Sequence, residues 1–315
     1  MFLPSTFFGI IPPMITPLNS DLSLDVPHTE KMVTHLIEGG VHGIFILGTT
    51  GESASISQDV KSDLIRLTCK IASGKTPVLV GITGCSLIES LDLAHIARES
   101  GATALVAAPP FYVNIDQEEL EFYYKRLADE VELPLMLYNM PSHTKISIDV
   151  ETAVALAKHP NIIGIKDSSG DLAYFERLCK AFADQPEFRI FVGPEEILAP
   201  SLEMGGHGGV SGGANLFPQL YVKAFEAYQA NDLELLQELH QTILFLSAHI
   251  YQNATYKSSY LKGLKAALSM EGLCQGILAP PLFAYSEEEK KTLKGNLAKV
   301  KTKVEKVLLL TPKAH

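Results

Sequence analysis

Short apolar runs alternate with longer amphipathic stretches along most of the chain. Eight of the runs have the length and composition of strands, and they span 7–15, 43–47, 77–82, 104–108, 134–139, 162–166, 189–193 and 208–212. Between them, the spacing of apolar residues predicts helices such as 57–73 and 86–99. Asp149 and Asp171 are the expected caps of two more. Eight strand and helix pairs can be counted in this way, and the last helix is 217–230.

This alternation predicts parallel strands that close into a barrel. Strand–helix–strand repeats place successive strands parallel to one another, and eight repeats match the (β/α)8 architecture. We therefore expect an α/β fold, a TIM (β/α)8 barrel, over residues 1–231. Residues 232–315 follow without an obvious linker and should form a C-terminal three-helix extension packed on the barrel, with helices near 233–252, 257–271 and 286–308.

Composition and charge exclude several classes of protein. The chain has 315 residues, of which 46% are hydrophobic, so it can bury one large core. The formal net charge of -10 argues against a nucleic-acid or anionic-membrane surface. The basic stretch 290–306 is best interpreted as a solvated helix face, and no apolar run is long enough to cross a membrane.

The cysteines and the N-terminal segment predict a cytoplasmic protein. Four cysteines lie far apart and form no CxxC pair or metal-ligand spacing, which suits a reducing compartment. The apolar start, "MFLPSTFFGIIPPMITPL", lacks a basic region and is broken by prolines, so it resembles a first strand more than a signal peptide. The ten histidines show no HExxH pattern and no carboxylate cluster has ligand spacing, so we expect no metal.

A lysine stands where a core residue would be expected. In "PNIIGIKDSSGD" (160–171), Lys166 follows an apolar run that reads as a buried strand. At the carboxyl end of a barrel strand it would face the active-site mouth, where an apolar environment favours the neutral amine. A neutral amine can attack a carbonyl and form a Schiff base. The alternative is a buried ion pair with Asp167 or Glu195, and the strand-end position alone does not decide between them.

Other strand ends supply hydroxyl groups. Tyr138 could exchange protons with a carbinolamine or aldol oxygen if a second hydroxyl holds it in place. Thr49 and Thr50 lie in a Gly-flanked turn, "GTTGES" (48–53), whose hydroxyls and backbone N–H groups can bind a small carboxylate. Amine, phenol and turn together predict a site for a 2-oxo acid. Taken singly, the turn could be only a tight connection and the tyrosine only a packed side chain.

Three motifs carry a family resemblance. "GTTGES", "YNMP" and "GIKDSSGD", in this order along an eight-strand barrel, resemble the dihydrodipicolinate synthase and N-acetylneuraminate lyase family of class I, lysine-dependent aldolases. The resemblance covers nearly the whole chain. It implies Lys166 as the Schiff-base lysine, Tyr138 as the proton shuttle, and Thr49 and Thr50 as the residues that hold the carboxylate of pyruvate or a pyruvate-derived substrate. The iminium is itself the electron sink, so no organic cofactor is implied.

The same resemblance implies an oligomer. Tyr112, in "PPFY", matches the tyrosine that family members lend across a subunit interface to complete a hydroxyl relay with Thr50 and Tyr138. A homotetramer built from two tight dimers is therefore expected. Val210, in "GGHGGVSGG", matches the residue whose backbone carbonyl faces the proton-relay end of the site.

His143 bears on the choice of substrate. In the lysine-biosynthetic synthases the segment after the shuttle tyrosine usually has an arginine that receives the distal carboxylate of aspartate semialdehyde, but "YNMPSHT" has His143 there. A neutral imidazole offers one donor, whereas arginine offers a bidentate fork. Sialate lyases typically have serine at the position of Thr49. We therefore expect a 2-keto-3-deoxy sugar acid aldolase or dehydratase, with 4-hydroxy-tetrahydrodipicolinate synthase as the alternative.

Two other classes of function stay open, and so do the roles of three serines. The glycine-rich segment 205–213 lies at the last strand, where barrels often bind phosphate, and Lys166 would then be structural. A binding protein that keeps the fold without turnover is the second class, although all the family's reacting residues are present. His143 and several serines could contact substrate hydroxyls, while solvent or backbone capping is the simpler role for the serines Ser168, Ser169 and Ser211.

Overall fold

Eight parallel strands surround the centre of the molecule in the computed structural model, which describes residues 7–252 and 256–310. They pair in the order β1-β8-β7-β6-β5-β4-β3-β2. The strands are β1 (Gly9–Ile10), β2 (Ile44–Ile46), β3 (Val78–Gly81), β4 (Ala104–Ala107), β5 (Leu135–Asn139), β6 (Ile162–Asp167), β7 (Arg189–Val192) and β8 (Gly208–Gly209).

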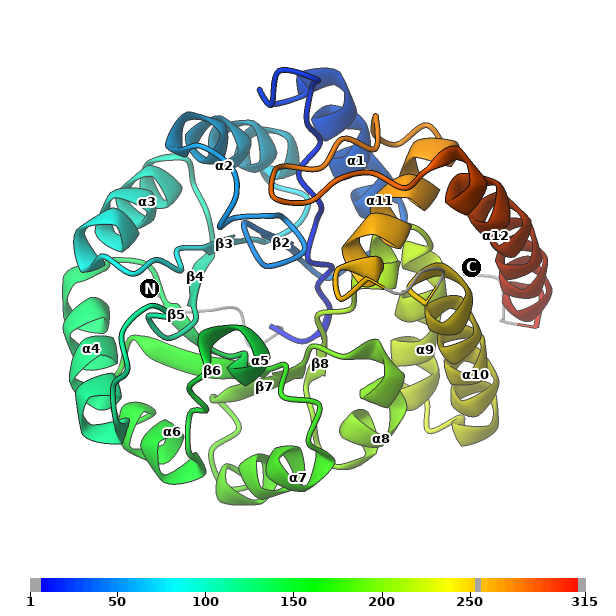
Figure 1. Ribbon diagram of the computed structural model, residues 1–315. Coiled ribbons are helices and arrows are strands. Elements are labelled where there is room, and N and C mark those ends of the chain that lie inside the picture. Colours follow the sequence, from blue (N-terminus) through cyan, green and yellow to red (C-terminus); the bar gives the residue numbers. More distant parts are fainter. Residues whose placement is uncertain (1–6, 253–255, 311–315) are drawn as a thin grey trace.

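Helices form a ring around these strands (Figure 1). The ring and its connections comprise α1 (Val26–Glu38), α2 (Gln58–Ala72), α3 (Leu87–Glu99), α4 (Gln117–Glu130), α5 (Pro141–Thr144), α6 (Val150–Leu156), α7 (Leu172–Ala181), η1 (Glu195–Ile197), α8 (Leu198–Glu203), η2 (Gly212–Asn215) and α9 (Pro218–Gln229). After them come α10 (Leu233–Ile250), α11 (Ser259–Met270) and α12 (Glu287–Leu308). Among the described residues, no helix combines the length and the apolar character that a membrane span requires.

Backbone hydrogen bonds between β2 and the segment that follows β1 close the barrel. The N–H of Met14 donates to the carbonyl of Phe45 at 2.8 Å, and the N–H of Phe45 donates to the carbonyl of Pro12 at 2.9 Å. The first strand is shorter than the predicted 7–15 because proline has no N–H to give to a ladder. The expected TIM (β/α)8 barrel with C-terminal helices is confirmed.

Helix capping follows the sequence in part. Ser57 caps α2 by accepting from the N–H of Val60, and the Asp171 carboxylate accepts from two backbone N–H groups at the start of α7. Asp149 occupies the cap position of α6, but its side chain accepts no capping hydrogen bond. The predicted cap position of Asp149 is confirmed, but its carboxylate lines a surface pocket rather than bonding the helix N-terminus.

Apolar residues form two cores on the two faces of the barrel wall. The larger lies between strands and helices. The smaller fills the barrel interior and consists of Phe7, Ile11, Phe45, Leu79, Ala104, Val106, Ala108, Met136, Tyr138, Phe191 and Val210. The interior is thus packed with side chains rather than open, as is usual for this architecture. Tyr138 and Phe45 in this inner core set the surroundings of Lys166.

The last three helices pack on one side of the barrel, next to α9 (Figure 1). The helix α10 contacts α9 and α12, and α11 contacts α12 and η2. In α12 the apolar side chains Leu293, Leu297 and Val300 are buried, while lysines such as Lys291 and Lys299 are exposed. The basic stretch 290–306 is therefore a solvated helix face, as predicted.

Candidate active site

Lys166 points into the barrel from β6. It pairs with Tyr138 of β5 on one side and with Phe191 of β7 on the other, and it is 5% exposed. Its Nζ lies 4.0 Å from the centroid of the Tyr138 ring and 5.0 Å from that of the Phe45 ring. The amine therefore lies against aromatic faces at the end of an apolar strand.

The two carboxylates considered as ion-pair partners are bonded elsewhere. Asp167 accepts from the Asn139 side chain at 2.8 Å and from the N–H and hydroxyl of Ser169 at 3.1 and 2.9 Å. Glu195 accepts from the N–H of Gly213 and from two tyrosine hydroxyls. Within the described part of the chain, Lys166 forms no ion pair with either, so a structural salt bridge does not explain its position.

Tyr138 carries a phenol prepared for proton transfer. Its hydroxyl lies 3.3 Å from the hydroxyl of Thr49. Burial raises the pKa of Tyr138, but the charge of Lys166 and hydrogen bonds from Thr49, Lys166 and Ser168 outweigh it, so the pKa is lowered below its usual value of 10. A phenol with a lowered pKa gives up and regains its proton more readily near neutral pH.

The two threonines of the turn face different partners. The Thr50 hydroxyl is buried and lies 3.0 Å from the hydroxyl of Tyr260, while Thr49 is the exposed neighbour of Tyr138. The expected relay, in which Thr50 bonds to Tyr138, is corrected by this geometry because adjacent residues of the tight turn project in different directions. Tyr260 was not predicted, since a tyrosine in an amphipathic helix 210 residues away carries no local signal.

Tyr112 lies apart from the other site residues. It belongs to the loop between β4 and α4 and is 88% exposed. Its neighbours Phe111 and Val113 are also exposed, at 43% and 53%. Within the described residues of the chain, Tyr112 hydrogen-bonds neither Thr50 nor Tyr138. Within one chain, the expected relay of Tyr112 with Thr50 and Tyr138 is therefore not formed.

His143 lies on α5, directly after β5, and is exposed. Its Nδ1 is 2.9 Å from the hydroxyl of Ser142. Partial burial and the charge of Lys145 lower the pKa of His143, so the imidazole is neutral at pH 7. The Lys145 Nζ itself donates to the carbonyl of Ser142 at 2.7 Å.

Val210 and the three serines differ in their distance from the reacting groups. Val210 is buried in the inner core with Tyr138, and its N–H donates to the carbonyl of Val192 at 2.7 Å. Ser168 is close enough to lower the pKa of Tyr138 by a hydrogen bond, as noted above. Ser169 is engaged by Asp167, and the buried Ser211 hydroxyl has no partner among the described residues. Of the three serines, Ser168 is thus the one that contacts Tyr138.

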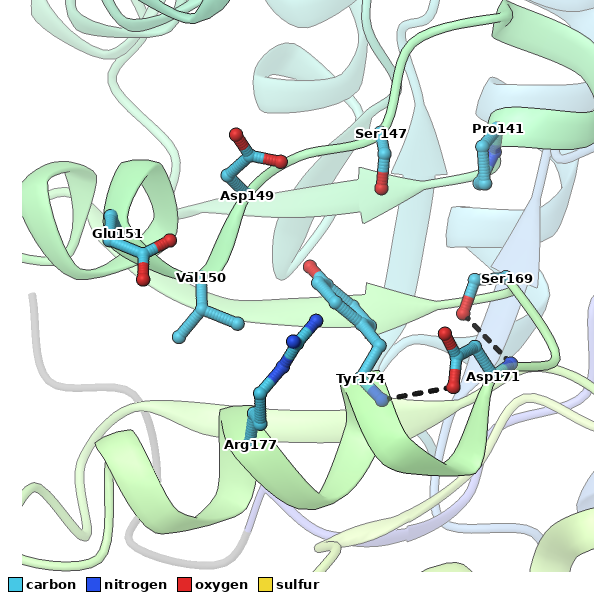
Figure 2. Close-up of a pocket in the computed structure, with 9 residues that line it drawn as sticks. All are labelled: Pro141, Ser147, Asp149, Val150, Glu151, Ser169, Asp171, Tyr174 and Arg177. Atoms are coloured by element: carbon cyan, nitrogen blue, oxygen red, sulfur yellow. Dashed lines mark hydrogen bonds between the residues drawn. The ribbon is translucent and has the colours of Figure 1, made fainter.

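A polar pocket of about 580 Å³ lies beside the barrel mouth (Figure 2). It is lined by Pro141, Ser147, Asp149, Val150, Glu151, Ser169, Asp171, Tyr174 and Arg177. Neither Lys166 nor Tyr138 belongs to the lining, so the reacting groups lie outside this pocket. Although carboxylates line it, no three His, Cys, Asp or Glu side chains in the described ranges come together as a metal site.

The glycine-rich segment after β7 is occupied by groups of the protein itself. A Cβ on Gly212 would lie 1.8 Å from the Tyr260 hydroxyl, and one on Gly213 would lie 2.0 Å from the Tyr221 hydroxyl. The N–H of Gly213 donates to Glu195 at 2.8 Å. These glycines therefore make room for side chains, and the N–H that a phosphate would need is already bonded. The phosphate-binding alternative gains no support from this geometry.

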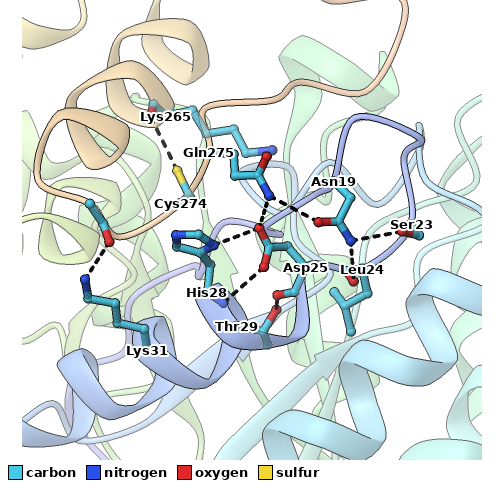
Figure 3. A network of polar contacts seen from close by, with 11 residues as sticks. Asn19, Ser23, Leu24, Asp25, His28, Thr29, Lys31, Lys265, Cys274 and Gln275 are labelled. Atoms are coloured by element: carbon cyan, nitrogen blue, oxygen red, sulfur yellow. Dashed lines mark hydrogen bonds and ion pairs between the residues drawn. The ribbon is translucent and has the colours of Figure 1, made fainter.

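The C-terminal extension is tied to the start of α1 by a polar network (Figure 3). Asp25 is buried at the cap of α1, where it contacts His28 Nδ1 at 2.8 Å and accepts from the Gln275 side chain at 2.7 Å. Lys31 donates to the carbonyl of Gly272 at 2.7 Å. The loop after α11 is thereby fixed against the barrel.

A buried ion pair joins the same extension to the site turn. Glu52, in "GTTGES", pairs with Lys265 of α11, and both side chains are 1% exposed. The second carboxylate oxygen of Glu52 accepts from the N–H of Ala279 at 2.8 Å, and Lys265 also donates to the carbonyl of Ile277 at 2.5 Å. The turn that presents Thr49 and Thr50 is therefore held by α11 and by the loop that follows it.

Breaking this pair should destabilise the fold strongly. Lys265→Met leaves Glu52 as an uncompensated buried charge, and we expect a loss of about 3–5 kcal/mol in the free energy of unfolding. Equilibrium urea unfolding at pH 7 measures it. The control is Lys301→Met, which breaks a half-exposed pair with Glu271 at 2.8 Å and should cost about 1 kcal/mol or less. Equal losses in the two variants would contradict this role for Glu52.

Comparisons with known proteins agree with the observed fold. The model of the family described as "Dihydrodipicolinate synthetase family" matches residues 6–300. The 4-hydroxy-tetrahydrodipicolinate synthase of Methanopyrus kandleri is 34% identical, over 93% of this chain and 96% of that protein. A dihydrodipicolinate synthase structure from Bacteroides thetaiotaomicron is 45% identical, covers 95% of this chain and 100% of its own, and superposes with a TM-score of 0.91. YagE of Escherichia coli K12, solved in complex with pyruvate, is 30% identical, covers 94% and 99%, and gives a TM-score of 0.88.

Proposed function

Since the chain belongs to the dihydrodipicolinate synthetase family, a family of lyases, we propose that it acts on 2-oxo acids through a Schiff base on Lys166. The observation that carries the proposal is the Lys166 amine, buried against the Tyr138 ring at 4.0 Å without an ionic partner among the described residues. A lysine amine with no carboxylate partner is available to attack a ketone and form a Schiff base.

The residues at the barrel mouth support each step of this chemistry. The Lys166 amine attacks the ketone carbon, and a proton passes from the new ammonium to the alkoxide to give a neutral carbinolamine. Tyr138 then donates a second proton to that oxygen, so that water leaves, an iminium forms, and the phenolate regains its proton in a later step. Electron withdrawal by the iminium then lets the bond at the neighbouring carbon break or form. Thr49 holds the Tyr138 phenol by its hydroxyl. The iminium supplies the electron sink, so this chemistry needs no organic cofactor.

Pyruvate is the 2-oxo acid that we propose for the covalent step. YagE, a relative with the same fold, was solved in complex with pyruvate. The turn of Thr49 and Thr50 offers hydroxyls and backbone N–H groups for its carboxylate. We assign carboxylate binding to this turn.

For the remainder of the substrate we propose a 2-keto-3-deoxy sugar acid. With Nδ1 engaged by Ser142, the neutral His143 imidazole keeps Nε2 for a hydrogen bond with one substrate hydroxyl, whereas it is a weak partner for a second carboxylate. A hydrogen bond to a charged group is worth about 1.5–3 kcal/mol, so lacking an arginine should lower kcat/KM for aspartate semialdehyde by about one to two orders of magnitude.

A comparison of substrates tests this assignment. We expect cleavage or dehydration of a 2-keto-3-deoxy sugar acid to have a higher kcat/KM than condensation of pyruvate with aspartate semialdehyde. His143→Arg should shift the ratio toward the semialdehyde, and His143→Gln, which adds no charge, should not. Efficient condensation by the unmodified enzyme would overturn the sugar-acid assignment while leaving the Schiff base intact.

The second candidate is 4-hydroxy-tetrahydrodipicolinate synthase. It is favoured by the Methanopyrus relative, which bears that name, and by the solved Bacteroides structure. In that case another cation must bind the distal carboxylate, and Lys145 is the nearest in sequence to His143. Lys145→Met would then abolish condensation, whereas the sugar-acid assignment expects little change in turnover.

We further propose a cytoplasmic homotetramer built from two dimers. Support for the dimer comes from the exposed tip formed by Phe111, Tyr112 and Val113, whose apolar area would be covered by a second copy. All four cysteines are free, as suits a reducing compartment. In this assembly Tyr112 reaches the site of a neighbouring chain and meets its Thr49–Tyr138 hydroxyl pair.

A further inference from the structure

Tyr260 connects the C-terminal extension to the site turn. It lies in the first turn of α11 and its hydroxyl is 3.0 Å from the hydroxyl of Thr50. The same helix carries Lys265, which pairs with Glu52 of that turn. One helix of the extension therefore holds the turn at two points, one ionic and fully buried, the other a hydroxyl pair whose tyrosine is only half-buried.

The Tyr260 ring is fixed in orientation. It packs edge-on against Tyr251, with ring centroids 4.7 Å apart and an interplanar angle of 73°. The Tyr251 hydroxyl donates to Glu195 at 2.8 Å, and Glu195 is in turn held by the N–H of Gly213. The Tyr260 hydroxyl lies so close to Gly212 that any Cβ there would displace it. This packing restricts the phenol to the direction of Thr50.

The hydrogen-bonding capacity of Thr50 gives this contact a chemical consequence. A threonine hydroxyl has a single proton and two acceptor lone pairs. Burial raises the pKa of Tyr260 well above its usual value, so its phenol stays protonated and can donate. When Tyr260 donates to the Thr50 oxygen, the Thr50 proton is left free to point at a ligand.

We propose that Tyr260 is a positioning residue that orients the Thr50 hydroxyl proton toward the substrate carboxylate. Glu195 and Tyr251 act behind it by holding the ring. This inference rests on the proposed function, because it needs a 2-oxo acid whose carboxylate lies at the turn. Tyr260 touches no reacting atom, so its effect falls on substrate binding rather than on the covalent step.

Kinetics of Tyr260→Phe test the proposal, since the variant keeps the ring and loses only the hydroxyl. We expect KM for the 2-oxo acid substrate to rise about 2- to 12-fold, which is the contribution of one neutral hydrogen bond, with kcat changed less than about 2-fold. The pyruvate concentration for half-maximal borohydride trapping on Lys166 should rise by the same factor. An unchanged KM and trapping concentration would overturn the proposal.

Measuring Tyr260→Phe in two Thr50 variants separates an effect on the Thr50 hydroxyl from a general loosening of α11. In Thr50→Ser, which keeps a hydroxyl, Tyr260→Phe should still raise KM, whereas in Thr50→Val it should have no further effect. Equal effects in both backgrounds would mean that Tyr260 has only a structural role. The matched control is Tyr285→Phe, which removes a hydroxyl bonded to the Ser259 carbonyl of the same helix at 3.2 Å and should leave KM unchanged.

Borohydride trapping of the unmodified enzyme distinguishes a mistaken role for Tyr260 from a mistaken Schiff base on Lys166. If pyruvate and borohydride label Lys166 there, while Tyr260→Phe binds pyruvate equally well, only the inference fails. If the unmodified enzyme gains no label on Lys166, the Schiff base itself is refuted and the role of Tyr260 falls with it.

Discussion

Replacing Lys166 with methionine should abolish turnover, by about 10⁴-fold or more, with little change in stability. Methionine fills a similar volume against the Tyr138 and Phe45 rings but has no nucleophilic amine. Removing a group that performs the covalent step costs orders of magnitude in kcat. Because Lys166 forms no ion pair among the described residues, its loss leaves no uncompensated carboxylate behind. The measurements are kcat/KM and the urea midpoint of the purified variant.

A second buried lysine provides the matched control. Lys262 is 2% exposed, and its Nζ lies 3.7 Å from the centroid of the Tyr256 ring and 3.3 Å from that of Phe283. Like Lys166 it lies against aromatic rings, but it belongs to α11 and faces away from the barrel interior. Lys262→Met should keep turnover within a few-fold of the unmodified enzyme. Comparable losses in both variants, or turnover retained in Lys166→Met, would contradict the role given to Lys166.

Tyr138→Phe should lower kcat by about 10²–10⁴-fold, the usual contribution of a positioned proton-transfer group. The ring still fills its place in the inner core, so the fold should persist.

The pH profile of kcat in the unmodified enzyme should decline on the alkaline side with an apparent pKa below 10. The pKa of Tyr138 is lowered, and the phenol must be protonated to act as an acid. Thr49→Val removes a hydrogen bond that lowers this pKa, so it should move the decline to higher pH.

Tyr124 is the control for this prediction. It is fully buried in the outer core, and its hydroxyl donates to the carbonyl of Ala107 at 2.9 Å. Tyr124→Phe should lower the free energy of unfolding by about 1 kcal/mol and leave kcat near that of the unmodified enzyme. If Tyr138→Phe has the same profile as Tyr124→Phe, the Tyr138 hydroxyl serves packing alone.

The barrel could be predicted from the sequence because its signal is local and repeated. Each strand is a short apolar run and each helix has its own periodicity, so eight independent pieces of evidence point to one architecture. The length of the first strand could not be predicted as well, since its prolines shorten the hydrogen-bonded part of β1 without changing the path of the chain.

The position of Lys166 was also predictable, because an ammonium after an apolar strand is conspicuous in any sequence. Contacts between hydroxyls were not. Which of Thr49 and Thr50 meets Tyr138 depends on the exact dihedral angles of the turn, and the pairing of Thr50 with Tyr260 joins residues 210 positions apart. The same holds for Glu195, whose three donors come from segments after β7. Such contacts follow from tertiary packing, which leaves no pattern in the sequence.

The central claim is that Lys166 forms a Schiff base with a 2-oxo acid, and reductive trapping tests it most directly. The enzyme is incubated with pyruvate and borohydride and then digested. The masses of its peptides are measured by mass spectrometry. We predict a reduced pyruvyl group on the peptide that carries Lys166, and none in Lys166→Met. Label on another residue such as Lys145, label that persists in Lys166→Met, or no label at all would contradict the claim.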